Sequence, residues 1–172
     1  AGRTVSGGRL NAFMAIATPD GVSPAPISDL ATGSATNHSV VLRWTATGDD
    51  DLTGTASRYD VRYSTAPIDG SSFDMAQRAT PAPAPVPSGG LQEMTVEGLE
   101  FSTTYYFAIK VLDEWGNASP ISNVATTLTL GPPDVTVDPG SLAASLFTGG
   151  TVIQTITISN AGTGELLFET WA

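Results

Sequence analysis

The chain has 172 residues, 41% of them apolar, and a formal net charge of −10 at neutral pH. The apolar content is enough for a folded core, and no apolar run approaches the ~20 residues of a membrane span. The negative charge disfavours nucleic acid and anionic membrane surfaces as partners. Because the chain contains no cysteine, disulfides, thiolate metal sites and cysteine nucleophiles are excluded.

A short helix is predicted near the N-terminus, from about residue 8 to residue 17. Its apolar residues have the spacing of one helical face: Leu10, Phe13, Met14 and Ala17. Pro19 and Gly21 end this pattern, and the proline-rich residues 23–26 are typical of an extended linker.

From about residue 27 to residue 128, apolar and polar residues alternate with period two, as in half-buried antiparallel strands. The clearest strands surround Trp44, Val61 and Phe107. Weaker strands are expected at 27–30, at 73–78, around Met94, and at 124–128 with Val124, Thr126 and Leu128 on the apolar face. About seven strands at this spacing predict an all-β fold, an immunoglobulin-like β-sandwich.

Two proline-containing segments divide the rest of the chain. The alternating prolines of 81–87 are expected at an exposed sheet edge, because proline cannot donate to a strand ladder. Residues 131–133 predict a second linker. Beyond it, strands are expected at Val135 and Val137, at 153–158 and at 166–168, with 159–164 as the turn between the last two. These are too few for a closed core, so 131–172 is interpreted as a linker plus a partial second β-domain.

The middle segment is interpreted as one domain, residues 23–130, and over residues 24–130 it resembles a fibronectin type III domain of the kind found in bacterial extracellular proteins. Trp44 lies where that family has a strand-B tryptophan, and Tyr63 matches its strand-C tyrosine. Residues 99–105 match the family's leucine-to-tyrosine corner, where the Tyr105 phenol is expected to bond to backbone. Phe101 stands where the family usually has proline.

Shorter resemblances flank this segment. Residues 5–15 resemble the last helix of a subtilisin-like serine protease, so 1–22 is interpreted as a remnant of that catalytic domain plus a linker. Residues 134–172 resemble the first strands of Ig-like repeats in secreted bacterial proteins. Together they imply a secreted or cell-surface parent protease, whose catalytic domain, neighbouring repeats or identical subunits are this chain's protein partners.

The chain itself is expected to have no enzymatic activity and no cofactor other than calcium. The Gly-Thr-Ser-x-Ala motif of subtilases is absent, as are a Gly-x-Ser-x-Gly elbow and a phosphate-binding loop. The one histidine, His38, lies in a polar segment and is expected to be a solvated loop residue rather than a catalytic base.

Two acidic loops form the candidate binding site, because the implied fold places them at one pole of the sandwich. Carboxylates in flexible loops are suitable calcium ligands. The candidate metal ligands are Asp49, Asp50, Asp51 and Asp113. The candidate ligand contacts, with Trp115 suited to stacking on a sugar, are Glu114, Trp115 and Asn117. The alternative is that the aspartates cap their own turns and that Trp115 packs over the rim of the sandwich.

Three functions remain open at this point. The favoured one is a non-catalytic extracellular spacer or interaction module. A second is a calcium- or carbohydrate-binding module that uses the two acidic loops. A third is a subunit of an extracellular filament that assembles by β-strand exchange through the C-terminal segment. The linker before the sandwich is expected to lie beside Asp49–Asp51, where Arg3 or Arg9 would pair with them.

Overall fold

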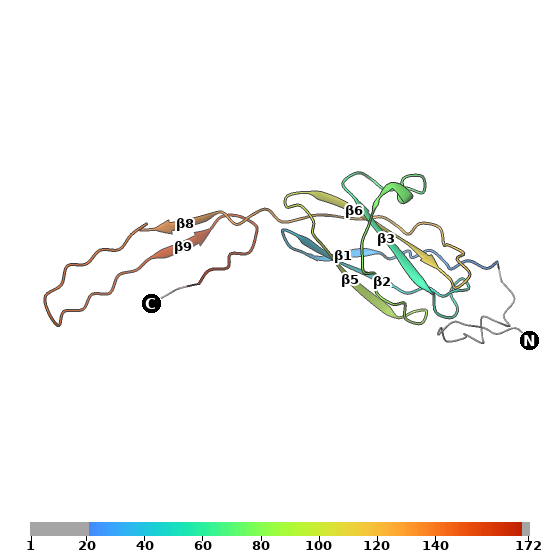
Figure 1. Cartoon of the computed structure of the whole chain (residues 1–172), viewed down its shortest axis with the longest axis horizontal. Helices are drawn as coiled ribbons and strands as arrows, with labels where there is room; N and C mark the ends of the chain where they lie inside the picture. The colour runs from blue at the N-terminus through green and yellow to red at the C-terminus, as the bar shows by residue number, and fades with distance from the viewer. Residues whose placement is uncertain (1–20, 170–172) are drawn as a thin grey trace, which may run out of the picture.

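A computed structural model describes residues 21–169 of the chain. Two antiparallel sheets pack face to face as a β-sandwich, and a long hairpin extends from one end of it (Figure 1). This is the all-β, immunoglobulin-like architecture that the alternation predicted. The helix and the arginine pairs expected within residues 1–20 lie outside the described residues. Within the described part, no helix is long and apolar enough to cross a membrane.

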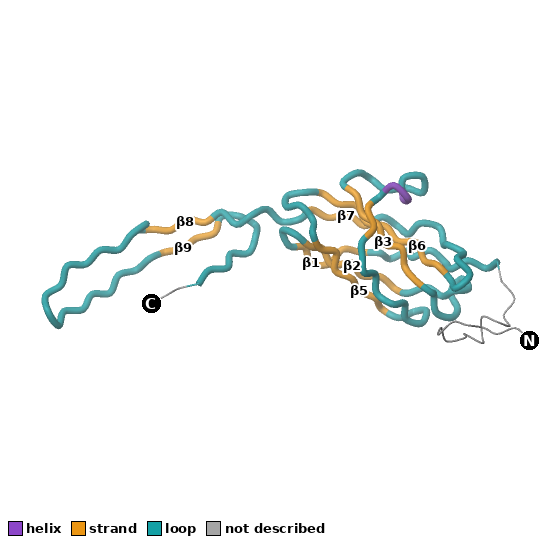
Figure 2. The backbone as a smooth tube through the Cα atoms, in the orientation of Figure 1, coloured by secondary structure: helices purple, strands orange, loops and turns teal. Residues whose placement is uncertain are grey.

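The two sheets of the sandwich divide its strands three to four (Figure 2). One has the order β1–β2–β5, formed by β1 (Ala31–Ala35), β2 (Ser39–Thr45) and β5 (Leu91–Glu97). The other has the order β4–β3–β6–β7, formed by β4 (Gln77–Arg78), β3 (Arg58–Ser64), β6 (Thr104–Leu112) and β7 (Ala125–Leu128). A single 3₁₀ turn, η1 (Phe73–Met75), precedes β4, so the strand expected at 73–78 is reduced to two residues.

Trp44 occupies the space between the sheets. Its side chain is 2% exposed, and its ring meets that of Tyr59 on the opposite sheet edge to face, with centroids 5.2 Å apart. Six further residues of the two sheets and their turns are buried in the same cluster: Val61, Tyr63, Leu99, Tyr105, Phe107 and Ile109.

The pole opposite the acidic loops is closed by hydrogen bonds between turns. The Tyr105 hydroxyl accepts the backbone N–H of Glu100 at 3.0 Å, which confirms the expected tyrosine corner. His38 Nδ1 lies 2.8 Å from the carbonyl oxygen of Leu99, and its ring contacts Phe101 edge-on. His38 is exposed in its turn, as expected, and its ring also ties the β1–β2 turn to the β5–β6 turn.

The first strand begins later than expected, at Ala31 instead of 27–30. The side chain of Asn123 explains the shift. It accepts the N–H of Leu30 at 2.9 Å and donates to the carbonyl of Leu30 at 2.8 Å. Since one side-chain amide satisfies both backbone groups of Leu30, this segment closes the side of the sandwich without joining a ladder.

The expected apolar face of β7 is wrong. Val124 and Leu128 are 38% and 58% exposed, whereas Ala125 is 6% and Thr129 1% exposed. Ala125 pairs with Phe107 in the ladder, and Thr129 is anchored because its hydroxyl donates to the Glu100 carbonyl at 2.6 Å. These contacts fix the register, and period two then turns the larger side chains outward.

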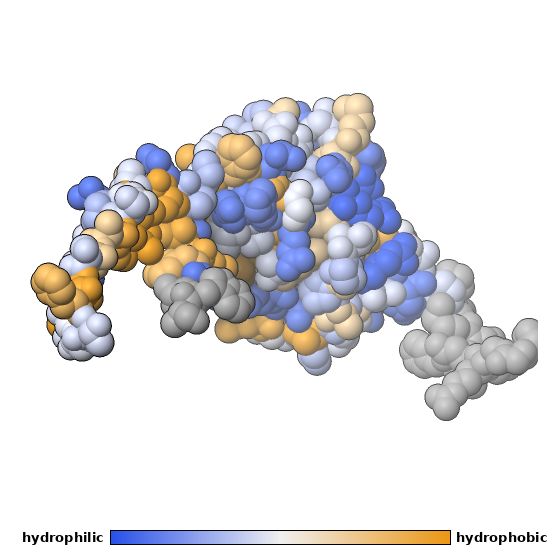
Figure 3. Space-filling model, turned by 60° about the vertical axis from the view of Figure 1, so that its left-hand side comes forward, coloured by the Kyte–Doolittle hydropathy of each residue, from blue (hydrophilic) through white to orange (hydrophobic). Residues whose placement is uncertain are grey.

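The C-terminal segment forms one hairpin, β8 (Val135–Asp138) paired with β9 (Thr157–Asn160). Residues 153–156 and 166–168 are not strands, so the expectation for them is wrong. The register places Val135, Val137 and Ile158 on one face, and all three are exposed. Figure 3 shows this apolar surface on the hairpin. Residues 159–164 do not connect two strands but fold back onto the linker.

Replacing Trp44 with alanine is expected to lower the free energy of unfolding by about 3–5 kcal/mol, because a large buried ring leaves a cavity. Urea denaturation followed by far-ultraviolet circular dichroism measures the change. The matched control is Trp115→Ala, since Trp115 is only half-buried and should lose less. Equal losses in the two variants would contradict the central role of Trp44.

Candidate functional site

The loop that carries Asp49–Asp51 lies where the chain enters the sandwich. Asp51 donates its N–H to the Ser23 carbonyl at 3.2 Å and accepts the N–H of Ala25 at 3.0 Å. The linker thus pairs with the acidic loop through its backbone, as expected from the sequence. The loop also closes on itself, because Asp49 and Thr53 are joined by an N–H···O bond of 2.9 Å.

The carboxylate of Asp113 is used within its own turn. Asp113 is 1% exposed. Its Oδ1 accepts the backbone N–H groups of Trp115 and Asn117 at 2.9 and 2.8 Å, and its Oδ2 accepts Nδ2 of Asn117 at 2.7 Å. This is the capping arrangement that stood as the alternative to metal binding. Trp115 and Glu114 are half-buried at this turn.

The two acidic loops do not form an evident metal cage. In residues 21–169, no group of three or more Asp, Glu, His or Cys side chains is gathered in a way that suits a metal ion. Calcium binding by Asp49–Asp51 with Asp113, and ligand contact by Glu114, Trp115 and Asn117, therefore stay predictions.

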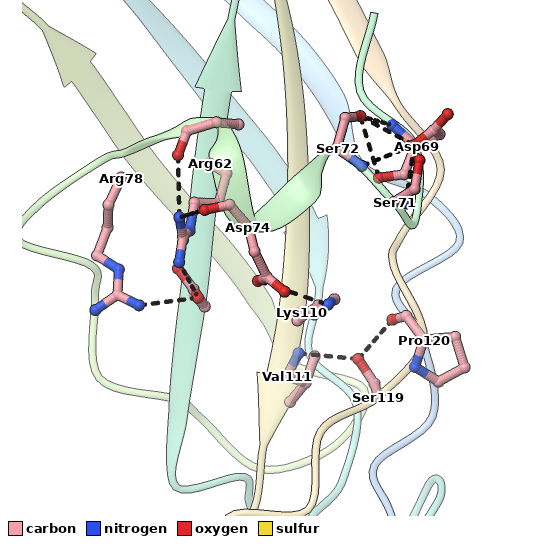
Figure 4. Close-up of polar contacts among 12 residues, drawn as sticks. Arg62, Asp69, Ser71, Ser72, Asp74, Arg78, Lys110, Val111, Ser119 and Pro120 are labelled. Carbon is pink, nitrogen blue, oxygen red and sulfur yellow. Dashed lines mark hydrogen bonds and ion pairs between the residues drawn. The ribbon is translucent and has the colours of Figure 1, made fainter.

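A second polar cluster, on the outer face of β3, was not foreseen. Asp60 receives two hydrogen bonds from Arg62, at 2.9 and 3.1 Å, and a third from Arg78 at 3.0 Å (Figure 4). Arg62 also donates through Nη1 to the carbonyls of Asp74 and Ala76, at 3.0 Å each. The guanidinium of Arg62 thus fastens the segment around η1 onto the four-stranded sheet. The only sequence signal was the Asp60/Arg62 pair on the polar face of a strand.

Phe73 lies beneath two cations of this cluster. Its side chain is fully buried with Ile68 and Ala108. The Arg62 guanidinium carbon is 5.4 Å, and the Lys110 ammonium 4.6 Å, from the ring centroid. Both cations are within the range of cation–π attraction. This cluster covers the outer face of the four-stranded sheet, so that sheet has apolar contacts on both of its faces.

The charges of the cluster set the protonation of its carboxylates. Burial raises the pKa of Asp60, but the hydrogen bonds and positive charges of Arg62 and Arg78 outweigh this effect, so the pKa is lowered overall. At the neighbouring turn, hydrogen bonds from Ser71 and Ser72 lower the pKa of Asp69 to about 2. Both aspartates are therefore ionised at neutral pH, where Asp60 pairs with Arg62 and Arg78 and Asp69 caps its own turn.

The chain was compared with known families, curated proteins and solved structures. Residues 25–127 match the family described as fibronectin type III domain. Calcium-activated chloride channel regulator 1 of Sus scrofa is 31% identical over 140 residues, which are 77% of this chain and 15% of that protein. Chitinase A1 of Niallia circulans is 32% identical over 144 residues, 82% of this chain and 17% of that protein. The chain thus spans only about 15–17% of the length of these relatives.

Solved structures align with the chain at lower identity. Titin domains A168–A170 align at 20% identity with a TM-score of 0.45, over 62% of this chain and 32% of that one. The sensor domain of the anti-sigma factor RsgI4 from Pseudobacteroides cellulosolvens aligns at 20% identity with a TM-score of 0.41, over 65% of this chain and 100% of that one.

Asp60→Asn is expected to destabilise the protein by about 1–3 kcal/mol at pH 7, because it leaves two arginines without their carboxylate. The pKa of Asp60 is lowered in the folded state, so its contribution is present above the unfolded-state value of 3.8 and is lost as pH falls below that value. The difference in the free energy of unfolding between wild type and variant should stay constant from about pH 5 to 8 and shrink in more acidic buffer. Denaturant titrations at several pH values measure it. The control, Asp138→Asn on the exposed hairpin, should show no such convergence.

A calcium titration followed by melting temperature tests the predicted metal site. Calcium at a hundredfold excess over Kd would stabilise the folded chain by about 2.7 kcal/mol. A rise in melting temperature that disappears in Asp51→Asn would support the site. An unchanged melting temperature at millimolar calcium would exclude it. Magnesium at the same concentration controls for ionic strength.

Proposed function

Because the chain belongs to the fibronectin type III family, we propose that it is a non-catalytic spacer and interaction module within a longer extracellular protein. The observation that carries the proposal is that the chain is fixed where it enters the sandwich and also where it leaves. A module whose two ends are both fixed sets the distance and orientation between its neighbours.

The entry is fixed by backbone pairing. Ser23 and Ala25 bond to Asp51, as described above, and Asn123 donates its N–H to the carbonyl of Ile27 at 3.3 Å. The linker therefore continues into the sandwich along a defined path. In Figure 1 the start of the described chain and the hairpin lie at opposite ends of the sandwich.

The exit is fixed by the turn at 159–164. Gly131 donates its N–H to Thr163 Oγ1 at 2.7 Å, and Asn160 Oδ1 accepts the N–H of Asp134 at 3.0 Å. The turn lies so close to the linker that a Cβ on Gly162 would clash with the Pro132 carbonyl oxygen. Only glycine permits this contact, which restrains the hairpin relative to the sandwich.

The kind of protein that carries this module is the finer part of the proposal. The resemblance of residues 5–15 to a subtilisin-like protease and the 32% identity to a protein named chitinase A1 both support an enzyme as the parent. The first resemblance also implies that this enzyme is secreted. In such an enzyme the module would hold a catalytic domain at a set distance from a neighbouring domain or a surface.

Self-assembly is a second candidate function, supported by the apolar face of the hairpin. Val135, Val137 and Ile158 are exposed on a two-stranded sheet that has no covering layer within the described residues. Such a face favours association with another sheet. The charged residues of this segment are all acidic: Asp134, Asp138, Glu165 and Glu169. Like charges oppose the pairing of two identical hairpins, so the spacer is favoured.

Distance measurement between two spin labels tests the spacer. The natural chain contains no cysteine, so Thr55→Cys near the entry and Thr136→Cys on β8 are labelled specifically. We expect one narrow distance distribution, which Gly162→Ala should broaden because it dislodges the turn from the linker. Gly140→Ala is the matched control, since a Cβ there meets no atom within 4 Å.

Two outcomes of this measurement would contradict the proposals. A distribution as broad in the natural chain as in Gly162→Ala would mean that the hairpin is not held, and the spacer proposal would fail. A chain labelled at Thr136 alone can show a distance only between two copies. If no such distance is observed at high protein concentration, self-assembly through the hairpin is excluded.

A further inference from the structure

The four edges of the two sheets are not equally protected. β1 is interrupted by a register shift between Thr32 and Ala35 and lies beside β7. β4 has only two residues. β5 has seven residues and pairs with β2 in unbroken register along its whole length. Short or irregular edges resist the addition of another strand, and a long regular edge accepts it.

The backbone of β5 offers hydrogen-bonding groups at its free edge. Two bonds at the end of β2 fix the direction of its backbone groups. The N–H of Thr45 points toward the β1 side and bonds to the Asp29 carboxylate at 3.0 Å. The N–H of the next residue, Ala46, points toward the β5 side and bonds to the Gly90 carbonyl at 2.8 Å. Because this direction alternates along antiparallel strands, the even-numbered residues of β5 face β2. The N–H and C=O groups of Leu91, Glu93, Thr95 and Glu97 therefore point away from the sheet.

The outward-facing backbone groups of β5 have no backbone partner in residues 21–169. Among the described residues, β2 is the strand that pairs with β5, and no other backbone group bonds to residues 91–97. Residues 79–83 line a groove beside the edge. Pro81 and Pro83 have no N–H to donate to the carbonyls of β5, and no backbone group of 79–83 bonds to residues 91–97.

The groove has room for the side chains of an added strand. It holds about 580 Å³ and lies between the edges of β4 and β5. Its lining includes Tyr63, Arg78 and the two prolines on one side, and Met94 and Val96 on the other. Side chains that point inward from an added strand would meet a mixed lining, in which Met94, Val96 and the two prolines are apolar and Gln77, Arg78 and Thr80 are polar. Small side chains suit that position.

The outer face of β5 selects for positive charge. Glu93, Thr95 and Glu97 are exposed there. Glu93 pairs with Arg43 at 2.7 Å, in a contact where both side chains are more than half exposed. Glu97 makes no ion pair within the described residues. Lysine or arginine directly opposite these glutamates in a new strand would form favourable cross-strand pairs.

We propose that the free edge of β5 binds an extended, basic segment of a protein partner, which adds a strand to the three-stranded sheet. The bound segment alternates Lys or Arg, opposite Glu93 and Glu97, with small residues that enter the groove. A second copy of β5 is a poorer occupant, because glutamates would face glutamates. The inference deepens the interaction part of the proposed function, and it does not depend on the spacer part.

The test uses a fluorescein-labelled peptide of sequence Lys-Val-Thr-Val-Lys-Val-Thr and measures its fluorescence anisotropy with the 172-residue chain. Thr95→Pro removes a central donor from the free edge and leaves the ladder with β2 intact, so binding should weaken at least about tenfold. Thr95→Ala keeps that N–H and should bind like the natural chain. Circular dichroism verifies that both variants fold.

Charge variants test the chemistry of the partner. Glu93→Gln and Glu97→Gln should each weaken binding about two- to fivefold at low salt, and Glu165→Gln on the hairpin should not. A peptide with Glu in place of Lys should not bind. If Thr95→Pro fails to fold, a peptide methylated at every backbone nitrogen replaces it, since that peptide cannot donate to β5.

Several results would overturn the inference. Binding that survives Thr95→Pro or full N-methylation is not strand addition. Equal binding of the Glu and Lys peptides removes the role of charge. Self-association of the chain that Thr95→Pro abolishes would make a second copy the occupant. None of these results bears on the distance between spin labels at positions 55 and 136 within one chain. Failure of the strand-addition proposal is therefore distinguishable from failure of the spacer proposal.

Discussion

The burial of Trp44 between the two sheets is the constraint on which the other features depend. Its ring fills the space between β2 and β3, where it meets Tyr59, and this contact sets how the sheets face each other. Once that is fixed, β2 holds β5 in register and β3 holds β6 in register. The turns then converge at two poles. One pole is closed by Tyr105, Glu100 and His38, and the other receives the linker at Asp51.

The sandwich is closed by hydrogen bonds along one side and has a groove along the other. The two sides therefore serve different purposes. On the closed side, the Asn123 amide bonds to Leu30, and the N–H of Leu130 bonds to the Thr36 carbonyl at 2.9 Å. Bonds of this kind hold both connections to neighbouring segments, which a spacer requires. On the open side, β4 and β5 are separated by a groove, and there the backbone is available to a partner.

The outer cluster links the two sides of this arrangement. Asp60 holds Arg78 at 3.0 Å, and Arg78 is part of the wall of the groove. Asp60 also holds Arg62, which fastens the η1 segment over Phe73. One carboxylate thus orders a covering segment and a groove wall together. Both contacts depend on the same carboxylate, whose lowered pKa keeps it ionised at neutral pH.

The sequence by itself determined the strands around Trp44, Val61 and Phe107, because each has one clearly apolar face and period two leaves a single way to bury it. It also determined the tyrosine corner, since residues 99–105 form a local motif. It did not determine which face of 124–128 is buried, or that Phe73 packs beneath Arg62 and Lys110. Small and aromatic residues are compatible with either position, and contacts from strands distant in sequence decided between them. The free edge of β5 likewise arises from strand order, which alternation along a single strand does not encode.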